Sequence, residues 1–198
     1  MTIIIFLIGL LIGFLLNLAS NRIYYHISGE KIKSINFFIV TVSAVLFLIL
    51  FIKFGLDKLF IKGVVMSAIL IVVSFVDLRY EIIPDRLCII ALICGLFFVF
   101  SGDISFIKSL SGMLTGGIIL FLLALIPGAL GGGDIKLMFG IGAFLGTYKV
   151  LWAIFIAFAL SAVISIFLLL FKVKGAKDYI PFGPFLALGS FLSFLIFT

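Results

Sequence analysis

Eight apolar runs, separated by short polar segments, take up almost all of this chain. A helix needs about 20 apolar residues to cross a bilayer, and inside hydrocarbon the backbone groups of each segment must bond within the protein. The sequence therefore predicts an all-α fold, a polytopic transmembrane helix bundle of about eight helical segments, with residues 1–198 forming a single domain. The runs are Ile3–Ala19, Ile35–Leu56, Phe60–Val76, Leu87–Phe100, Phe106–Leu130, Ile135–Thr147, Val150–Phe171 and Phe182–Phe197.

The composition supports a membrane-embedded protein and excludes a soluble globular domain. Of the 198 residues, 65% are hydrophobic and only 11% are charged, which is far more apolar than an ordinary soluble domain. The net charge of +6 is not arranged as a basic stripe with interleaved aromatic residues, so no nucleic-acid partner is expected. The Lys and Arg residues lie between the apolar runs, where they determine how a chain is oriented in the lipid bilayer.

The distribution of these cations predicts the orientation. No basic segment precedes the first run, which argues for a retained first helix with its N-terminus outside. Counting the runs from there places nine cations on one side and five on the other, and the positive-inside rule makes the first set cytoplasmic. We therefore predict a multi-pass protein of the cytoplasmic (inner) membrane. The nine are Arg22, Lys31, Lys33, Arg79, Arg86, Lys136, Lys172, Lys174 and Lys177, and the five are Lys53, Lys58, Lys62, Lys108 and Lys149.

Two aspartates lie at the ends of apolar runs, where a charge is costly and marks a candidate functional site. Asp77 closes the third run, and Asp134 follows three consecutive glycines. The predicted orientation puts both on the cytoplasmic side of the membrane. Two carboxyl groups held together can hydrolyse a peptide bond, because one takes a proton as the other gives one. The same pair could instead line the cavity of a transporter or channel, and the two residues alone leave both alternatives open.

The residues around this pair have expected supporting roles. Gly131 and Gly133 allow a close backbone approach and a positive-φ hinge, so a substrate strand could lie beside Asp134. The run that follows is only about 20 Å long as a helix, which predicts that it begins below the membrane surface. Asp85 competes with Asp77 for a catalytic role, but its place after a proline predicts a helix cap or a position near the substrate. Lys136 is expected to be an interfacial charge.

No metal ion or other cofactor is expected. Cys88 and Cys94 lie six residues apart within an apolar run, without the CxxC spacing of a metal site, and His26 is the single histidine. The glycine cluster is not followed by the Lys and Ser or Thr of a phosphate-binding loop, which argues against a nucleotide site.

Several segments taken together resemble a known family. Asp77 to Asp85, which ends in Ile-Pro-Asp, looks like the first catalytic segment of the type IV prepilin peptidases, membrane aspartyl proteases that process prepilins and pseudopilins. The segment Gly131–Lys136 looks like the GxGDxK segment of that family, and Pro181–Gly189 looks like its C-terminal signature. Gly13 to Arg22 resembles its N-terminal GSFLNV…R element, with Gly13 directly followed by Phe14. GxGD also occurs in presenilin and signal-peptide-peptidase relatives, but their PAL motif is not evident here.

The resemblance implies a function, and the chain differs from many members of the family in one respect. It implies that Asp77 and Asp134 are catalytic. It also implies that the substrates are prepilin-like or pseudopilin precursors, from which a leader peptide is removed. Such precursors belong to type IV pilus or type II secretion systems. Many members carry a cytoplasmic domain after the first helix, with paired CxxC motifs that bind zinc, associated with N-methylation of the product. Here that region, Asn21–Ser34, has no cysteine. The chain therefore resembles a short form, and methyltransferase activity is doubtful.

Overall fold

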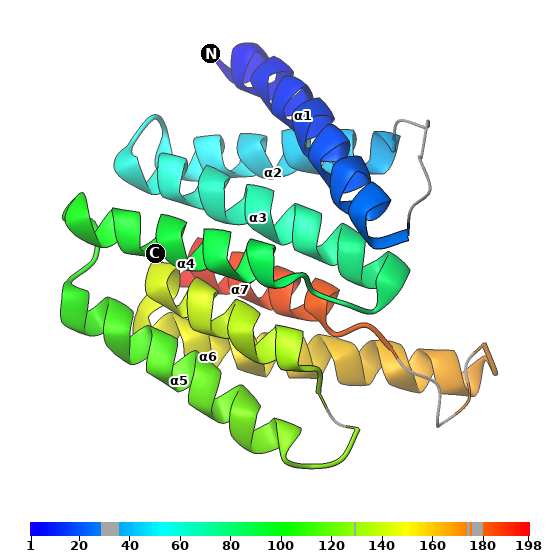
Figure 1. The fold of residues 1–198 in the computed structure, drawn as a ribbon. Helices are drawn as coiled ribbons and strands as arrows, with labels where there is room; N and C mark the ends of the chain where they lie inside the picture. The colour runs from blue at the N-terminus through cyan, green and yellow to red at the C-terminus, as the bar shows by residue number, and fades with distance from the viewer. Residues whose placement is uncertain (29–35, 129, 174, 176–179) are drawn as a thin grey trace.

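A computed structural model describes residues 1–28, 36–128, 130–173, 175 and 180–198 of the protein. Within these residues the secondary structure is entirely helical, without a strand, and the predicted all-α bundle is confirmed (Figure 1). The helices are α1 (Thr2–Ser28), α2 (Phe37–Phe54), α3 (Lys58–Tyr80), α4 (Asp85–Phe100), α5 (Phe106–Ala124), α6 (Gly132–Leu170) and α7 (Gly183–Phe197).

Helix α6 consists of two helical segments that meet at Gly146. The backbone of Gly146 leaves the helical region, with φ at 73° and ψ at 169°, a conformation that glycine adopts without the steric penalty of other residues. The chain turns back at this point, so residues 132–145 and 147–170 run in opposite directions (Figure 1). These segments correspond to the sixth and seventh apolar runs, which accounts for the eight helical segments expected from the sequence.

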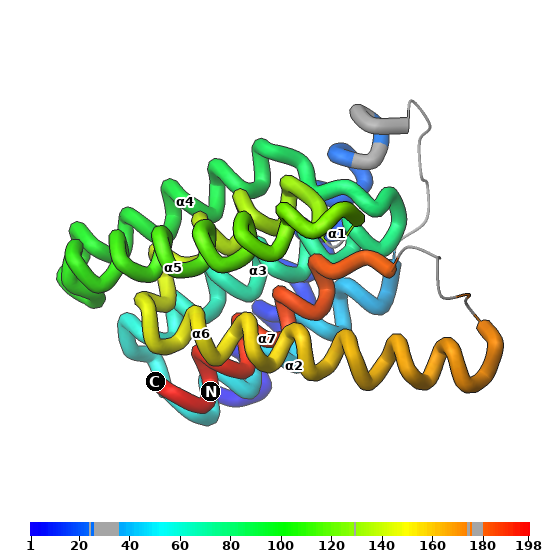
Figure 2. The backbone as a smooth tube through the Cα atoms, turned by 90° about the horizontal axis from the view of Figure 1, so that it is seen from below, coloured from blue at the N-terminus to red at the C-terminus, as the bar shows by residue number. Residues whose placement is uncertain are grey.

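Successive helical segments run back and forth between two ends of the bundle, as both views show (Figures 1 and 2). One end contains the end of α3 and the starts of α4, α6 and α7, and we call it the aspartate end because Asp77 and Asp134 lie there. The other, which we call the far end, contains the start of α3, the connection between α4 and α5, and the turn at Gly146.

Glycines allow α1 and α2 to pack closely. A Cβ atom added at Gly9 would lie 2.7 Å from the Cα atom of Ala44, and one added at Gly13 would lie 2.8 Å from the Cα atom of Val40. The hydroxyl group of Ser43 also donates a hydrogen bond to the carbonyl oxygen of Gly9 at 3.0 Å. Small residues and interhelical hydrogen bonds of this kind are what hold helices together inside a bilayer.

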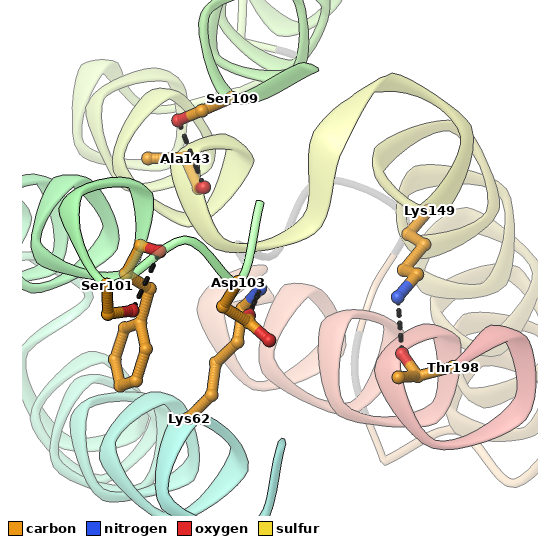
Figure 3. Close-up of polar contacts among 8 residues, drawn as sticks. Lys62, Ser101, Asp103, Ser109, Ala143, Lys149 and Thr198 are labelled. Carbon is orange, nitrogen blue, oxygen red and sulfur yellow. Dashed lines mark hydrogen bonds and ion pairs between the residues drawn. The ribbon is translucent and has the colours of Figure 1, made fainter. Parts of the chain in front are cut away.

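The same principle holds α5 against the first segment of α6. A Cβ atom at Gly112 would lie 2.4 Å from the carbonyl oxygen of Gly142, and one at Gly142 would lie 2.4 Å from that of Gly112. The buried hydroxyl group of Ser109 donates to the carbonyl oxygen of Ala143 at 3.1 Å (Figure 3). The first segment of α6, whose first turn carries Asp134, is therefore held against α5 by close backbone contact near Gly142.

The outer surface of the bundle is apolar. Large side chains such as Phe100, Ile107 and Phe37 are 89%, 75% and 74% exposed, and apolar exposure on this scale would be rare in a water-soluble monomer. Five of the described helices, α1, α2, α3, α5 and α6, are long and apolar enough to cross a membrane. Helices α4 and α7 are shorter, with 16 and 15 residues. The protein is therefore a multi-pass membrane protein.

The far end contains a buried ion pair that the sequence analysis did not predict. Lys62, near the start of α3, donates to a carboxylate oxygen of Asp103 in the connection between α4 and α5 (Figure 3). The two side chains are only 4% and 9% exposed. Nearby, Lys149 donates to the hydroxyl group of Thr198. These contacts tie α3 to the α4–α5 connection, and the second segment of α6 to the end of α7.

Helix α1 extends further than the first apolar run. It continues past Ala19 to Ser28, because the polar residues after Ala19 contain no helix-breaking residue before Gly29. The rest of the Asn21–Ser34 segment lies outside the described residues. So do four of the cations used to predict the orientation, Lys31, Lys33, Lys174 and Lys177.

Candidate active site

Asp77 lies in the last turn of α3 and is 3% exposed. The helix ends three residues later at Tyr80, where the cap residue Glu81 adopts a left-handed conformation and donates its backbone N–H to the carbonyl oxygen of Asp77 at 2.8 Å. The carboxylate accepts a hydrogen bond at 2.8 Å from the backbone N–H of Gly183, the first residue of α7. Burying a carboxyl group is costly without such a partner, so the start of α7 helps to keep Asp77 inside the bundle.

Asp134 lies in the first turn of α6 and is also 3% exposed. Its Oδ2 atom accepts a hydrogen bond at 3.1 Å from the backbone N–H of Gly131, which precedes the helix. Its Oδ1 atom is buried and has no hydrogen-bond partner among the described residues. Because buried polar atoms are nearly always paired, this oxygen is suited to accept a hydrogen bond from a substrate or a reacting water molecule.

The two aspartates come from different helices and lie at the same end of the bundle. Asp77 lies in the last turn of α3 and Asp134 in the first turn of α6, and both side chains are buried. Neighbouring carboxyl groups resist simultaneous ionisation and titrate as a coupled pair. The structure thus places both residues that the sequence analysis singled out, each buried, at the same end of the bundle.

Asp85 is directed to a different partner. Both of its carboxylate oxygens accept hydrogen bonds from Nζ of Lys136, at 2.7 and 2.9 Å. The side chains of Lys136 and Asp85 are 56% and 65% exposed, and such exposed ion pairs contribute little to stability because water screens them. The expectation that Asp85 caps a helix was wrong. Pro84 occupies the cap position, and Asp85 is the first residue of α4. Lys136 is exposed, and its expected place at the membrane interface stays a prediction.

The glycine cluster starts a helix and does not form a positive-φ hinge, so that expectation was wrong. Gly131 is extended, with φ at −82° and ψ at 151°, and α6 begins at Gly132, so neither position requires a glycine for its backbone angles. Gly133 is constrained by space instead. A Cβ atom there would lie 2.8 Å from the Cβ atom of Ile83, whereas one at Gly132 would have no neighbour within 4 Å. Gly133 therefore brings the start of α6 against the Ile-Pro-Asp segment.

An apolar groove lies next to Asp77. It has a volume of about 620 Å³ and lies between α2, α3 and α7. Its walls include Ser74 and Leu78, which flank Asp77 along α3, and Pro184, which follows Gly183 in α7. The groove therefore presents an apolar surface beside the last turns of α3, and neither Asp77 nor Asp134 lines it.

Comparison with known proteins identifies the family. Residues 64–166 match the model of the type IV leader peptidase family, and this range contains Asp77 and Asp134. The chain belongs to the type IV leader peptidase family.

The curated relatives that match this leader peptidase family member share the name prepilin leader peptidase/N-methyltransferase. The protein from Bacillus subtilis (strain 168) is 32% identical over 78% of this chain and 63% of its own length. Those from Aeromonas hydrophila and Legionella pneumophila are 28% and 29% identical, over 68% and 79% of this chain and 49% and 57% of their own lengths. The chain thus spans about half to two thirds of the length of these relatives. No solved structure matches the chain.

The contact between Gly183 and Asp77 was not predicted from the sequence. The signal was present, because Pro181-Phe182-Gly183-Pro184 was singled out as part of a leader peptidase signature, but the pattern alone did not indicate what it touches. The role of Ile83 was missed in the same way. Within the described residues, no three His, Cys, Asp or Glu side chains are grouped so that they could hold a metal ion.

Proposed function

We propose that this protein is a membrane aspartyl endopeptidase that removes the leader peptide from prepilin-like or pseudopilin precursors. The observation that carries the proposal is the match to the type IV leader peptidase family over a range that contains two buried aspartates at the same end of the bundle. Curated relatives are named for prepilin leader cleavage. We place the reaction at the cytoplasmic face of the inner membrane, because the order of the apolar runs in the sequence assigns nine of the fourteen Lys and Arg residues to the same side of the membrane as Asp77 and Asp134.

The proposed chemistry uses Asp77 and Asp134 as an acid–base pair. The ionised carboxylate removes a proton from a water molecule, whose oxygen attacks the carbonyl carbon of the scissile peptide bond. The protonated partner gives its proton to the carbonyl oxygen, and a second transfer protonates the leaving amine as the C–N bond breaks. Each aspartate accepts a backbone N–H at Oδ2, which orients the carboxyl groups. Asp134 keeps Oδ1 available for the reacting water.

The apolar groove supports the proposed substrate class. A prepilin-like precursor joins a short basic leader to a hydrophobic helix, and cleavage occurs at their junction. The groove offers an apolar surface beside the turn of α3 that carries Asp77. A hydrophobic segment there would place the junction with the leader, which precedes that segment, at the aspartate end.

Incubation of the purified protein with candidate precursors tests the proposal. We expect a shortened product whose mass equals that of the precursor without its leader. The alternative is a small ion-coupled transporter that uses the same carboxyl groups, and it predicts proton-coupled flux in liposomes with no cleavage. Flux without cleavage would therefore overturn the proposal.

The mass of the product also shows whether a methyl group is added to it. We predict an unmethylated product, because the segment Asn21–Ser34 contains no cysteine.

The cleavage rate should depend on pH along a bell-shaped curve. One carboxyl group must be ionised and the other protonated, so the rate falls at low pH when both are protonated and at high pH when both are ionised. Measuring kcat/KM across the pH range with a single precursor gives the two apparent pKa values of the pair. A rate that rises to a plateau without a second limb would contradict a two-carboxyl mechanism.

Replacing Gly133 by Val should lower turnover by about 10²-fold, the effect typical of a catalytic group displaced by about 1 Å. The added side chain would meet Ile83 and push the start of α6, with Asp134, away from α3. Gly132→Ala is the matched control, because its methyl group enters open space, and its turnover should stay close to that of the wild type. Equal turnover of both variants in the cleavage assay would show that the contact with Ile83 is unimportant.

A further inference from the structure

The start of α7 touches Asp77 directly. The backbone N–H of Gly183 donates to Oδ2 of Asp77 at 2.8 Å, although the two residues are 106 positions apart in the chain. The first N–H groups of a helix have no partner within the helix, so this donor is available to a side chain. Hydrogen bonds to an ionised carboxylate are among the stronger ones in proteins. Asp134, by contrast, is held by Gly131, only three residues away.

Position 183 has no room for a side chain. A Cβ atom there would lie 2.7 Å from Oδ2 of Asp77, 3.0 Å from its Cγ atom and 3.1 Å from its Cβ atom. Gly183 does not have a positive φ, so the backbone conformation does not require glycine. The requirement comes from the carboxyl group itself, which occupies the space where a side chain would be.

The residues on either side fix the place of Gly183. Phe182 is buried, and its ring packs on that of Phe158 in the second segment of α6, with 4.9 Å between the ring centroids. Pro184 has a fixed φ and no N–H, so the helix start is rigid and the next residue offers no competing donor. The segment 182–184 therefore presents one N–H group in a defined direction toward Asp77.

We infer that Gly183 is a positioning residue that holds the Asp77 carboxyl group in its reactive orientation. The inference rests on the proposed function, because it assigns the role through the catalytic use of Asp77. It gives the Pro181–Gly189 segment a specific task, which is to supply the backbone donor and the side-chain-free space that Asp77 requires.

The variant Gly183→Ala tests this role in the purified full chain. We expect kcat to fall by about 10²-fold, as for a catalytic group displaced by about 1 Å, while KM changes less than about twofold. The acidic limb of the pH–rate profile should move to higher pH, because a lengthened hydrogen bond stabilises the charged carboxylate less. A change of KM alone, with kcat and the pH profile retained, would overturn the inference and assign Gly183 to substrate binding.

Gly189→Ala is the control for a general disturbance of α7. A methyl group at Gly189 would lie 2.2 Å from the carbonyl oxygen of Ala153, on the face of α7 that packs against α6. It should lower the unfolding temperature, while the folded fraction keeps the wild-type pH profile. If Gly189→Ala shifts the profile as much as Gly183→Ala does, the effect belongs to the packing of α7 and the inference fails.

A second measurement needs neither cleavage nor a folded Gly183 variant. In Asp77→Ala, the backbone N–H of Gly183 loses its acceptor, so its hydrogen exchange should become at least several-fold faster than in the wild type. Asp134→Ala should leave that exchange rate unchanged. Equal exchange in all three proteins would overturn the inference. If the wild type cleaves no precursor, the proposed function fails, but the exchange experiment still decides whether Gly183 holds Asp77.

Discussion

Asp77→Asn and Asp134→Asn should each reduce leader cleavage by about 10²–10⁴-fold, the range that general acid–base catalysis contributes. Asparagine keeps the shape of the side chain, and its amide oxygen can still accept the hydrogen bond from Gly183 or Gly131. The amide cannot act as an acid or a base near neutral pH, so the substitution removes the proton transfer and keeps the packing. Single-turnover cleavage of a purified precursor, together with thermal unfolding of each variant in detergent, measures both quantities.

Asp85→Asn is the matched control among the carboxyl groups of the aspartate end. Asp85 is 65% exposed and pairs with Lys136, so its replacement should leave most of the cleavage activity. Substantial turnover by Asp77→Asn or Asp134→Asn would remove that residue from the catalytic pair. An Asp85→Asn variant as inactive as these two would show that the ranking of the three carboxyl groups is wrong.

Lys62→Met should lower the free energy of unfolding by about 3–5 kcal/mol, the usual cost of removing one member of a buried ion pair. The substitution leaves Asp103 buried without its partner, and Asp103→Leu should have a similar effect for the same reason. The double variant Lys62→Met/Asp103→Leu should recover most of the loss, because an apolar pair of similar volume can replace a buried ion pair. Denaturant unfolding in detergent micelles measures all three.

Lys58→Met provides the comparison for the loss of a lysine. Lys58 is exposed at the start of the same helix, so its replacement should change the free energy of unfolding by no more than about 0.5 kcal/mol. If the effects of the two single substitutions at Lys62 and Asp103 simply add in the double variant, the residues do not stabilise each other and the buried pair is not a unit.

The sequence predicted the features that depend on apolar length and on the order of the runs. The eight helical segments were predictable because each has its own apolar run, and counting them placed Asp77 and Asp134 at the same end of the bundle. The start of α6 was predictable from the glycine cluster, but its backbone angles were not. Glycine permits both a positive-φ hinge and an ordinary helix start, and neighbours such as Ile83 decide between them.

The features that were not predicted arise from contacts between distant segments. The bond between Gly183 and Asp77 requires that α7 pack against the end of α3, and no local pattern encodes that arrangement. The pairing of Lys62 with Asp103 was hidden for a related reason. The positive-inside rule uses Lys62 to predict the orientation in the membrane and gives Asp103 almost no weight. The rule therefore cannot show that the two residues form an ion pair inside the protein.

The turn at Gly146 also has a consequence for the surrounding lipid. It limits the first segment of α6 to residues 132–145, which is about 21 Å of helix, and α7 with 15 residues is about 22 Å long. Both are shorter than a hydrocarbon layer of about 30 Å. Such a hydrophobic mismatch is relieved when the bilayer becomes thinner around the short helices. Headgroups and water would then approach the starts of both helices, and a buried pair of carboxyl groups could receive its water without a channel through the bundle.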